Sequence, residues 1–299
     1  MIHRMKISSN THVSPDLAIV IPAYKGDFLK ECLESVFSQT DTGYHVYIFN
    51  DASADERIES IVHSFGHRSN LTYLRFDTNM GRESLPGQWN RCIRHIGDER
   101  WVWLFCDDDV MDPDCVESFR KAVKNHPDGR LFRFNTIKFR DNVLLRRNEL
   151  PTSVSLGAWL IGKLEYQFES YVVEYIFDRG LWDDIGGFPD FPLGWCADDW
   201  FWIQAMQQTD LITIPESLIY WRHSTHNISG AENDAATAFL KMTACCRFLD
   251  EMEATGVFRR YPAITDSFRR WIHAQWKYLS PQLSVEERTV FFRFNDRFP

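Results

Sequence analysis

Apolar runs alternate with helically spaced apolar residues over the first third of the chain. The runs are short and do not alternate with polar residues, which is typical of strands that are buried on both faces of a sheet. Between the runs, apolar residues recur at helical spacing in the segments 28–37 and 89–96. This alternation predicts an α/β fold with a mostly parallel, Rossmann-like sheet flanked by helices. The four runs lie at residues 17–21, 46–49, 71–76 and 101–106.

The second half of the chain is less regular. Residues 131–139 and 211–214 have the composition of two further strands, and residues 140–156 that of a loop. From about residue 235 the apolar residues again recur at helical spacing, with basic residues mainly off the apolar face. An amphipathic pattern of this kind predicts a C-terminal helical extension that packs against the sheet domain.

Charge and composition exclude several classes of protein. The formal net charge of −9 over 299 residues argues against non-specific nucleic-acid binding, which needs dense Lys and Arg. The seven cysteines form no CxxC pair and their odd number argues against a full disulfide framework, so we expect reduced thiols in a cytoplasmic protein. Residues 1–16 lack the apolar core of a signal peptide. No apolar run approaches the ~20 residues that span a bilayer.

The strongest chemical signal is Asp107-Asp108-Asp109, directly after the fourth apolar run. Adjacent carboxylates at the end of a buried strand repel one another and lose hydration, and a divalent cation relieves that cost. Oxygen ligands suit Mg²⁺ or Mn²⁺, which could bridge to a diphosphate. The alternative is a solvated acidic turn in which Asp112 and Asp114 cap the next helix.

Other polar groups have both a functional and a structural interpretation. Asp51, after the second run, could accept a hydrogen bond from a nucleobase N–H or belong to a helix N-cap cluster. Asp198 and Asp199 open a Trp-rich helical stretch, where one of them could act as a general base or interact with the helix dipole. His223 and His226 could bind phosphate or metal, although a structural role is the simpler interpretation.

Taken in order, these segments resemble the family 2 glycosyltransferases with a GT-A fold. Each motif is weak alone, but their order and spacing over residues 17–229 follow the family pattern. The motifs are Ile19–Tyr24, the opening strand and donor loop; Leu33–Thr40, ending in Ser-x-x-x-Gln-Thr; Asn50–Asp55, similar to Asp-Asp-x-Ser-x-Asp; Asn79-x-Gly81; Asp107–Asp109 followed by Pro113-Asp114; and Gly186-Gly187-Phe188 followed by Asp198-Asp199.

The resemblance implies roles for these residues. The nucleotide-sugar donor, with a UDP-sugar favoured, would contact Pro22, Tyr24, Asp51, Asn79, Arg82 and Asp107. Asp107, Asp108 and Asp109 would hold Mn²⁺ or Mg²⁺ together with the diphosphate. Asp199 would be the catalytic base, with Asp198 beside it.

The resemblance also implies a division of the chain and a reaction. We expect a polar tail (1–16), a nucleotide-sugar-binding half (17–125), an acceptor-binding half (126–234) and a helical extension (235–299). The reaction would be one in-line displacement that inverts the anomeric centre. The acceptor would be a saccharide or a lipid-linked hydroxyl, as in cell-surface polysaccharide or glycolipid assembly. Basic and aromatic residues near 258–271 also suit peripheral contact with an anionic membrane, although an ordinary packed helix explains them more simply.

The sequence departs from the family pattern at several positions. Asn50 replaces the first Asp of the usual pair, and Asp198 stands where Glu is usual. The letters of the DxD motif fit Asp107-x-Asp109, whereas the spacing to Pro113 aligns Cys106-x-Asp108. The Gln-x-x-Arg-Trp signature of processive synthases is absent, which favours addition of a single sugar.

Three rival functions remain at this level. A nucleotidyltransferase would normally show a Gly-rich, basic loop after the first strand, where residues 22–27 read Pro-Ala-Tyr-Lys-Gly-Asp. An aspartate-dependent phosphatase would carry its Asp-x-Asp motif near the start of the domain. A catalytically degenerate protein that only binds a nucleotide sugar would not need both acidic clusters.

Overall fold

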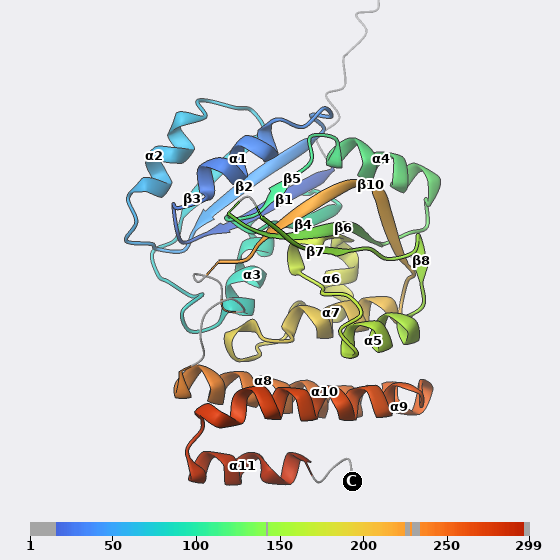
Figure 1. Cartoon of the computed structure of the whole chain (residues 1–299). Helices are drawn as coiled ribbons and strands as arrows, with labels where there is room; N and C mark the ends of the chain where they lie inside the picture. The colour runs from blue at the N-terminus through green and yellow to red at the C-terminus, as the bar shows by residue number, and fades with distance from the viewer. Residues whose placement is uncertain (1–15, 142, 225–227, 229–233, 296–299) are drawn as a thin grey trace, which may run out of the picture.

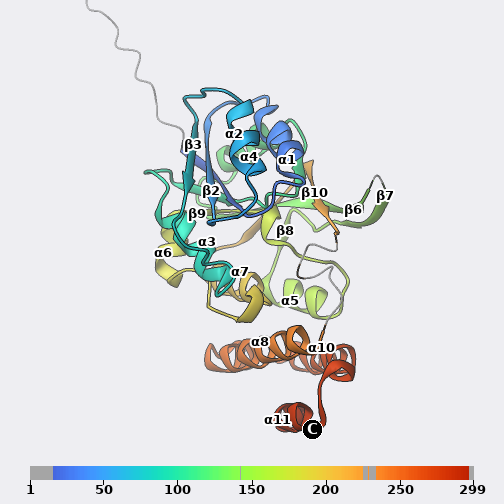
Figure 2. The ribbon, with the colours of Figure 1, turned by 90° about the vertical axis from the view of Figure 1, so that its left-hand side faces the viewer.

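The computed structural model describes residues 16–141, 143–224, 228 and 234–295 and arranges them in layers (Figure 1). A ten-stranded mixed sheet lies in the middle, with helices on both of its faces. The last helices of the chain form a further layer below the lower helices (Figure 2). The predicted α/β fold with a C-terminal helical extension is therefore confirmed.

The first half of the sheet is built from the predicted apolar runs. Its strands are β1 (Leu17–Ala23), β2 (Tyr44–Asn50), β3 (Leu71–Arg75) and β4 (Trp101–Leu104). They pair in parallel in the order β3-β2-β1-β4, so their carboxyl ends lie at one edge. The helices of this half are α1 (Leu29–Phe37), α2 (Arg57–Ser64), α3 (Leu85–Arg94) and α4 (Cys115–Asn125).

Strand β1 is longer than the sequence predicts. The prediction ends this strand at Pro22, whereas β1 continues through Pro22 to Ala23. The ladder between β1 and β4 closes with the N–H of Phe105 donating to the carbonyl of Val20. Pro22 follows Val20 by two residues, so its nitrogen points toward the β4 side of β1. It lies beyond the last hydrogen bond between β1 and β4. Its missing N–H therefore costs no hydrogen bond.

The second half of the sheet mixes parallel and antiparallel pairs. Its strands are β5 (Val110–Met111), β6 (Leu131–Arg140), β7 (Val143–Asn148), β8 (Ser153–Val154), β9 (Tyr175–Asp178) and β10 (Leu211–Arg222). β9 joins the two halves because it pairs antiparallel with both β4 and β6, while β10 runs parallel to β6. The helices here are α5 (Leu156–Leu164), α6 (Arg179–Ile185) and α7 (Ala197–Met206), with short 3₁₀ turns η1 (Val172–Glu174) and η2 (Pro192–Gly194).

Two segments of this half differ from the prediction. Residues 140–156 are predicted as a loop but contain β7 and β8; β7 begins with the apolar run Val143–Leu145, whose side chains are exposed, and has no run of buried residues. The strand predicted at 211–214 continues well beyond Pro215 as β10. The register against β6 shifts between Ile214 and Leu218, and this irregularity accommodates a residue that cannot donate a ladder hydrogen bond.

The two faces of the sheet bury separate apolar clusters. In β1, Leu17, Ile19 and Ile21 belong to the cluster that includes α1, α2 and α4, whereas Ala18 and Val20 belong to the cluster of the opposite face. An unbroken apolar run supplies both clusters because successive side chains point to opposite faces.

The C-terminal helices are α8 (Ala235–Ala254), α9 (Val257–Arg260), α10 (Ile264–Leu279) and α11 (Val285–Asn295). α10 packs against α5 and α8, and its predicted apolar face is buried. On its outer face Arg269 forms an ion pair with Asp266, and Arg270 with Glu165. These pairs fit a packed helix with a charged surface. Among the residues described, no helix has both the length and the apolar character needed to cross a membrane.

Candidate active site

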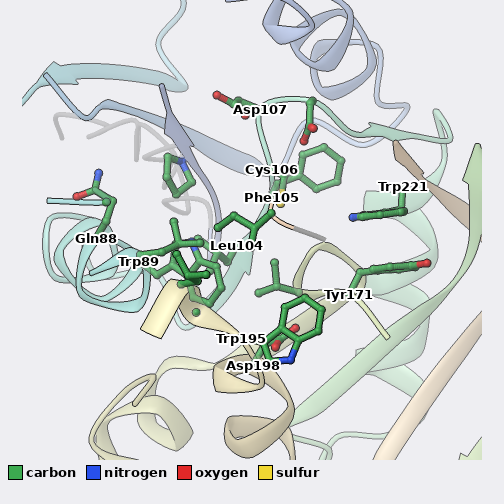
Figure 3. A pocket seen from close by; sticks show the side chains of 18 of the residues that line it. Gln88, Trp89, Leu104, Phe105, Cys106, Asp107, Tyr171, Trp195, Asp198 and Trp221 are labelled. Atoms are coloured by element: carbon green, nitrogen blue, oxygen red, sulfur yellow. The ribbon is translucent and has the colours of Figure 1, made fainter. Parts of the chain in front are cut away.

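A cavity of about 740 Å³ opens at the carboxyl ends of β1, β2 and β4 and reaches α5, α7 and α10 (Figure 3). Both halves of the sheet domain and the C-terminal helices thus contribute to its walls. Among the predicted site residues, Asp109 is the exception that does not line it. Those that do are Pro22, Tyr24, Asp51, Asn79, Arg82, Asp107, Asp108, Asp198 and Asp199.

Asp51 anchors the loop that follows β3. Its Oδ1 accepts hydrogen bonds from the backbone N–H of Met80 (2.9 Å) and from Nη2 of Arg91 (2.5 Å). Its Oδ2 accepts from the N–H of Gly81 (2.7 Å). A Cβ on Gly81 would lie 2.7 Å from that oxygen, so only glycine allows this approach. Asp51 does not cap α2; the backbone N–H of Arg57, the first residue of α2, donates to Oδ1 of Asp55 instead.

The loop residues near Asp51 form a turn at the rim of the cavity. The side-chain oxygen of Asn79 accepts a hydrogen bond from the backbone N–H of Arg82 (2.8 Å), and the Arg82 side chain is exposed. Arg91, on α3, was not singled out from the sequence. Nothing local to Arg91 indicates that it reaches Asp51, which lies 40 positions earlier in the chain.

The three adjacent aspartates have three different environments. Oδ2 of Asp107 accepts hydrogen bonds from the backbone N–H groups of Tyr24 (2.9 Å) and Lys25 (3.3 Å), so this carboxylate holds the loop after β1. Asp109 is fully buried, and its Oδ1 accepts from the backbone N–H of Arg222 (2.7 Å). Its Oδ2 finds no hydrogen-bond partner among the described residues. Asp107 thus binds the loop after β1, whereas Asp109 binds the end of β10.

Cys106, Asp108 and Asp109 form a group that could hold a metal ion. Each offers one ligand atom, and these atoms all lie within 4.8 Å of one another. Burial, followed by the charge of Asp107, raises the pKa of Asp108 to about 7. Burial and the charge of Asp108 also raise the pKa of Asp109. Carboxylates crowded in this way, one with an unpaired buried oxygen, fit a divalent cation.

The acidic residues after this group do not act as helix caps. Asp114 occupies the N-cap position of α4 without a side-chain hydrogen bond to it. Oδ2 of Asp112 instead accepts from the backbone N–H of Leu218 (2.9 Å), which ties the segment to β10. The solvated acidic turn considered from the sequence does not describe Asp109, which is buried, or Asp112, which bonds to a strand, whereas Asp107 and Asp108 are partly exposed.

Asp198 and Asp199 lie in the first turn of α7, where the helix dipole favours negative charge. Nζ of Lys163, on α5, lies 2.7 Å from Oδ1 of Asp199. Burial would lower the pKa of Lys163, but the two carboxylates outweigh it and raise that pKa. Burial, followed by the charge of Asp199, raises the pKa of Asp198 to about 7. The sequence did not indicate Lys163, because it is 36 positions from its partner.

An aromatic wall faces these carboxylates across the cavity. Tyr171 and Trp221 stack with their ring centroids 4.1 Å apart and their planes within 5° (Figure 3). Trp195 lies on the α7 side, and Trp271 of α10 also lines the cavity. Aromatic faces of this kind suit the apolar faces of sugar rings. The sequence indicated the Trp residues around Asp198 and Asp199, among them Trp195, but not Tyr171, Trp221 or Trp271.

Neither of the two histidines considered from the sequence is found among the described residues that line the cavity. The ring of His223 lies 5.8 Å from that of Trp221, nearly parallel to it, and His223 does not line the cavity. His226 lies outside the described residues.

Comparisons with known proteins agree with the fold. An uncharacterized glycosyltransferase of Haemophilus influenzae is 25% identical over 198 residues, which are 65% of this chain and 70% of that protein. Residues 1–349 of S. aureus TarS, in complex with UDP-GlcNAc, superpose with a TM-score of 0.62 at 16% identity, covering 94% of this chain and 88% of that one.

A second solved structure, the mannosyltransferase PcManGT of Pyrobaculum calidifontis in complex with GDP-Man and Mn²⁺, gives a TM-score of 0.54 at 14% identity. The superposition covers 97% of this chain and 82% of the PcManGT chain. At these identities both superpositions show a shared GT-A fold. The sequence model of the family described as glycosyl transferase family 2 matches residues 18–170, which is more than half of the chain. The chain therefore belongs to glycosyl transferase family 2.

Proposed function

We propose that the protein transfers a sugar from a nucleoside-diphosphate sugar to an acceptor hydroxyl, with inversion and with the help of a divalent metal ion. The observation that carries this proposal is the single cavity that joins three chemically distinct groups. These are the loop contacts around Asp51, the acidic group in which Asp108 lines the cavity and the buried Asp109 lies beside it, and the carboxylate pair at Asp198 and Asp199. Proteins of similar fold were solved with UDP-GlcNAc and with GDP-Man and Mn²⁺, which supports a nucleotide-sugar donor.

The residues of the first half would bind and orient the donor. Asp107 holds the loop of Tyr24 and Lys25 through backbone hydrogen bonds, which shapes the floor beneath the donor. Asp108 and Asp109, with Cys106 beside them, would hold the Mn²⁺ or Mg²⁺. When bound, such an ion stabilises the negative charge that grows on a departing diphosphate.

The residues of the second half would receive the acceptor. Its sugar ring would lie against Tyr171 and Trp221. Asp199 would accept the proton of the acceptor hydroxyl while the hydroxyl oxygen attacks the anomeric carbon and the bond to the diphosphate breaks. Lys163 holds the carboxylate of Asp199 in place through their 2.7 Å contact. One displacement of this kind inverts the anomeric centre and forms no covalent intermediate with the protein.

The proposal is tested by calorimetric titration of UDP, GDP and dTDP, each with and without Mn²⁺. We expect one nucleotide to bind more tightly in the presence of Mn²⁺. In the Asp108→Asn variant, the increase in nucleotide affinity on adding Mn²⁺ should be smaller by about tenfold or more. The reason is that a bound metal ion stabilises negative charge on a diphosphate by several kcal/mol. Asp107→Asn should weaken binding equally with and without Mn²⁺, because Asp107 acts on the loop after β1.

The two variants form a matched pair, since each removes one charge from neighbouring positions. Equal effects of Mn²⁺ on both variants would contradict the assignment of Asp108 to the metal. If the folded wild-type protein binds none of these nucleotides, the glycosyltransferase proposal itself fails and a degenerate or phosphatase function is favoured.

Metal binding should also depend on pH. Because the pKa of Asp108 is raised to about 7, its carboxyl group binds a proton more tightly in the native state than in the unfolded chain. Without metal this group contributes stability below about pH 4 that is lost as the pH rises to about 7. A metal ligand must be deprotonated, so the increase in Tm on adding Mn²⁺ should be small at pH 5.5 and large at pH 8. A Tm increase that is independent of pH, or largest at pH 5.5, would contradict this assignment.

A further inference from the structure

The hairpin of β6 and β7 exposes apolar side chains that the sheet domain leaves uncovered. Val143, Leu144 and Leu145, at the start of β7, are 60%, 67% and 46% exposed. In the part of the chain that the structure describes, no other three consecutive large apolar residues are exposed. Figure 2 shows β6 and β7 projecting from the side of the sheet domain. Contiguous exposed apolar residues of this kind mark an interaction surface.

Both faces of β7 are uncovered at this end of the strand. Val143 lies opposite Arg140 and Leu144 opposite Phe139, so the side chains of Val143 and Leu144 point to opposite faces. Among the described strands β7 pairs with β6 alone, which leaves its outer edge free as well. A partner protein would cover one face or one edge of such a strand. The interface of a lipid bilayer surrounds a projecting hairpin on all sides, and this fits the exposure of both faces.

The charge of the hairpin is opposite in sign to that of the whole chain. Residues 138–149 carry four basic side chains and two carboxylates, a net charge of +2, whereas the net charge of the chain is −9. Arg140 is exposed and forms no ion pair with any described residue. Nη2 of Arg146 donates to the backbone carbonyls of Tyr166 and Gln167, so its charge is not neutralised by a carboxylate there. Basic side chains beside apolar ones complement a surface of anionic lipids.

The basic residues also lie at suitable distances from the apolar ones. Arg146 follows Val143 by three residues, which is about 10 Å along a strand. Amphipathic segments bury their apolar groups about 5–10 Å deep at the boundary between headgroups and acyl chains. With Val143 at that depth, Arg146 lies at the level of the lipid phosphates. Arg140 lies beside Val143, and its long side chain can extend back to the same level.

We propose that the hairpin surface formed by Val143, Leu144 and Leu145 with Arg140 and Arg146 docks the protein on an anionic lipid bilayer. This surface is distinct from the segment 258–271, on α9 and α10, that was considered from the sequence. Docking through the hairpin needs no membrane-spanning helix, because the apolar side chains enter the interface alone.

Docking in this way brings the acceptor side of the cavity close to the membrane. Lys138 lies on β6 opposite Arg146 and lines the cavity together with Tyr171 and Trp221. The acceptor hydroxyl would then belong to a molecule that is anchored in the bilayer. This last step rests on the proposed function, whereas docking itself does not.

The test is sedimentation of the protein with vesicles of phosphatidylcholine alone, and with vesicles of phosphatidylcholine and phosphatidylglycerol in equal parts. We expect the wild-type protein to sediment with the anionic vesicles, less with the neutral ones, and less in high salt. The double variant Leu144→Ser with Leu145→Ser should lower the partition coefficient by about tenfold or more, because two apolar side chains no longer leave water. Arg140→Gln should lower it by about fivefold, and on the anionic vesicles alone.

The matched control is Val285→Ser with Val290→Ser, which makes a comparable change at two exposed positions of α11 and should leave vesicle binding unchanged. Wild-type protein that stays in solution with anionic vesicles, or a hairpin double variant that binds them as tightly as the wild type, overturns the inference. A wild-type dimer that the hairpin variant converts to a monomer, without vesicle binding, assigns the surface to a second copy of this chain and overturns it too. Nucleotide titration tests the proposed function separately, since either binding can fail while the other is retained.

Discussion

The Asp199→Asn variant is expected to lose about 10²- to 10⁴-fold in kcat, the usual contribution of a positioned general base. Asparagine has the shape of aspartate but cannot take the proton of the acceptor hydroxyl. Donor affinity should change little, because Asp199 lies on α7, away from the loop contacts around Asp51. The rate is measured as release of nucleoside diphosphate from the sugar nucleotide whose nucleotide binds, and the affinity is measured by calorimetry.

The controls separate the base from its neighbours. Asp210→Asn makes the same change on an exposed residue beyond the end of α7 and should leave kcat unchanged. Lys163→Met removes the cation that contacts Asp199, and we expect it to lower kcat while donor affinity changes little, because the carboxylate then loses the contact that positions it. Near-normal turnover in Asp199→Asn, together with a large loss in Asp198→Asn, would transfer the role of base to Asp198.

The Glu174→Gln variant is expected to lower the free energy of unfolding by about 3–5 kcal/mol, the usual cost of breaking a buried ion pair. Glu174 and Arg133 are both fully buried, and Nε of Arg133 lies 2.8 Å from Oε1 of Glu174. The other carboxylate oxygen accepts from Oγ1 of Thr136 at 2.7 Å. Glutamine leaves the guanidinium of Arg133 charged and without its anionic partner. Urea unfolding should show a lower midpoint with an unchanged m-value.

A surface ion pair provides the comparison. Arg147 and Glu149 lie 2.6 Å apart but are both more than half exposed, so Glu149→Gln should cost less than about 1 kcal/mol. The double replacement Arg133→Met with Glu174→Leu should recover part of the stability lost in Glu174→Gln, because no unpaired charge then remains. A cost for Glu174→Gln as small as that of the surface variant would show that water reaches the pair.

The buried ion pair of Arg133 and Glu174 matters for the cavity because Glu174 lies close in the chain to Tyr171, which lines it. Glu174 ends η1, directly after the segment that carries Tyr171 into the aromatic wall. Nε1 of Trp103, on β4, donates to the carbonyl of Val173 at 2.7 Å and ties the same segment to the parallel half of the sheet. Loss of the ion pair should therefore disturb the acceptor side of the cavity before the donor side.

The sequence by itself determined the α/β fold and nine of the residues that line the cavity. Strand and helix periods are local, so the apolar runs predicted β1, β2, β3 and β4 within a few residues. The carboxyl ends of parallel strands meet at one edge, so Pro22, Asp51 and Asp107, which the family resemblance indicated, all lie at the cavity. The same local patterns failed for β7, which pairs only with β6 at the margin of the sheet and leaves Val143, Leu144 and Leu145 exposed.

Only the tertiary structure decided how the polar groups pair. Three adjacent aspartates look equivalent in the sequence. In the structure, the backbone N–H of Tyr24 donates to Asp107, and the backbone N–H of Arg222 donates to Asp109. Arg91 reaches Asp51, and Lys163 reaches Asp199, across long stretches of chain. Hydrogen bonds and ion pairs act over a few ångströms, and which groups come that close depends on how the helices pack on the sheet. The sequence pattern places elements, and packing between the elements then selects the partners of each charged side chain.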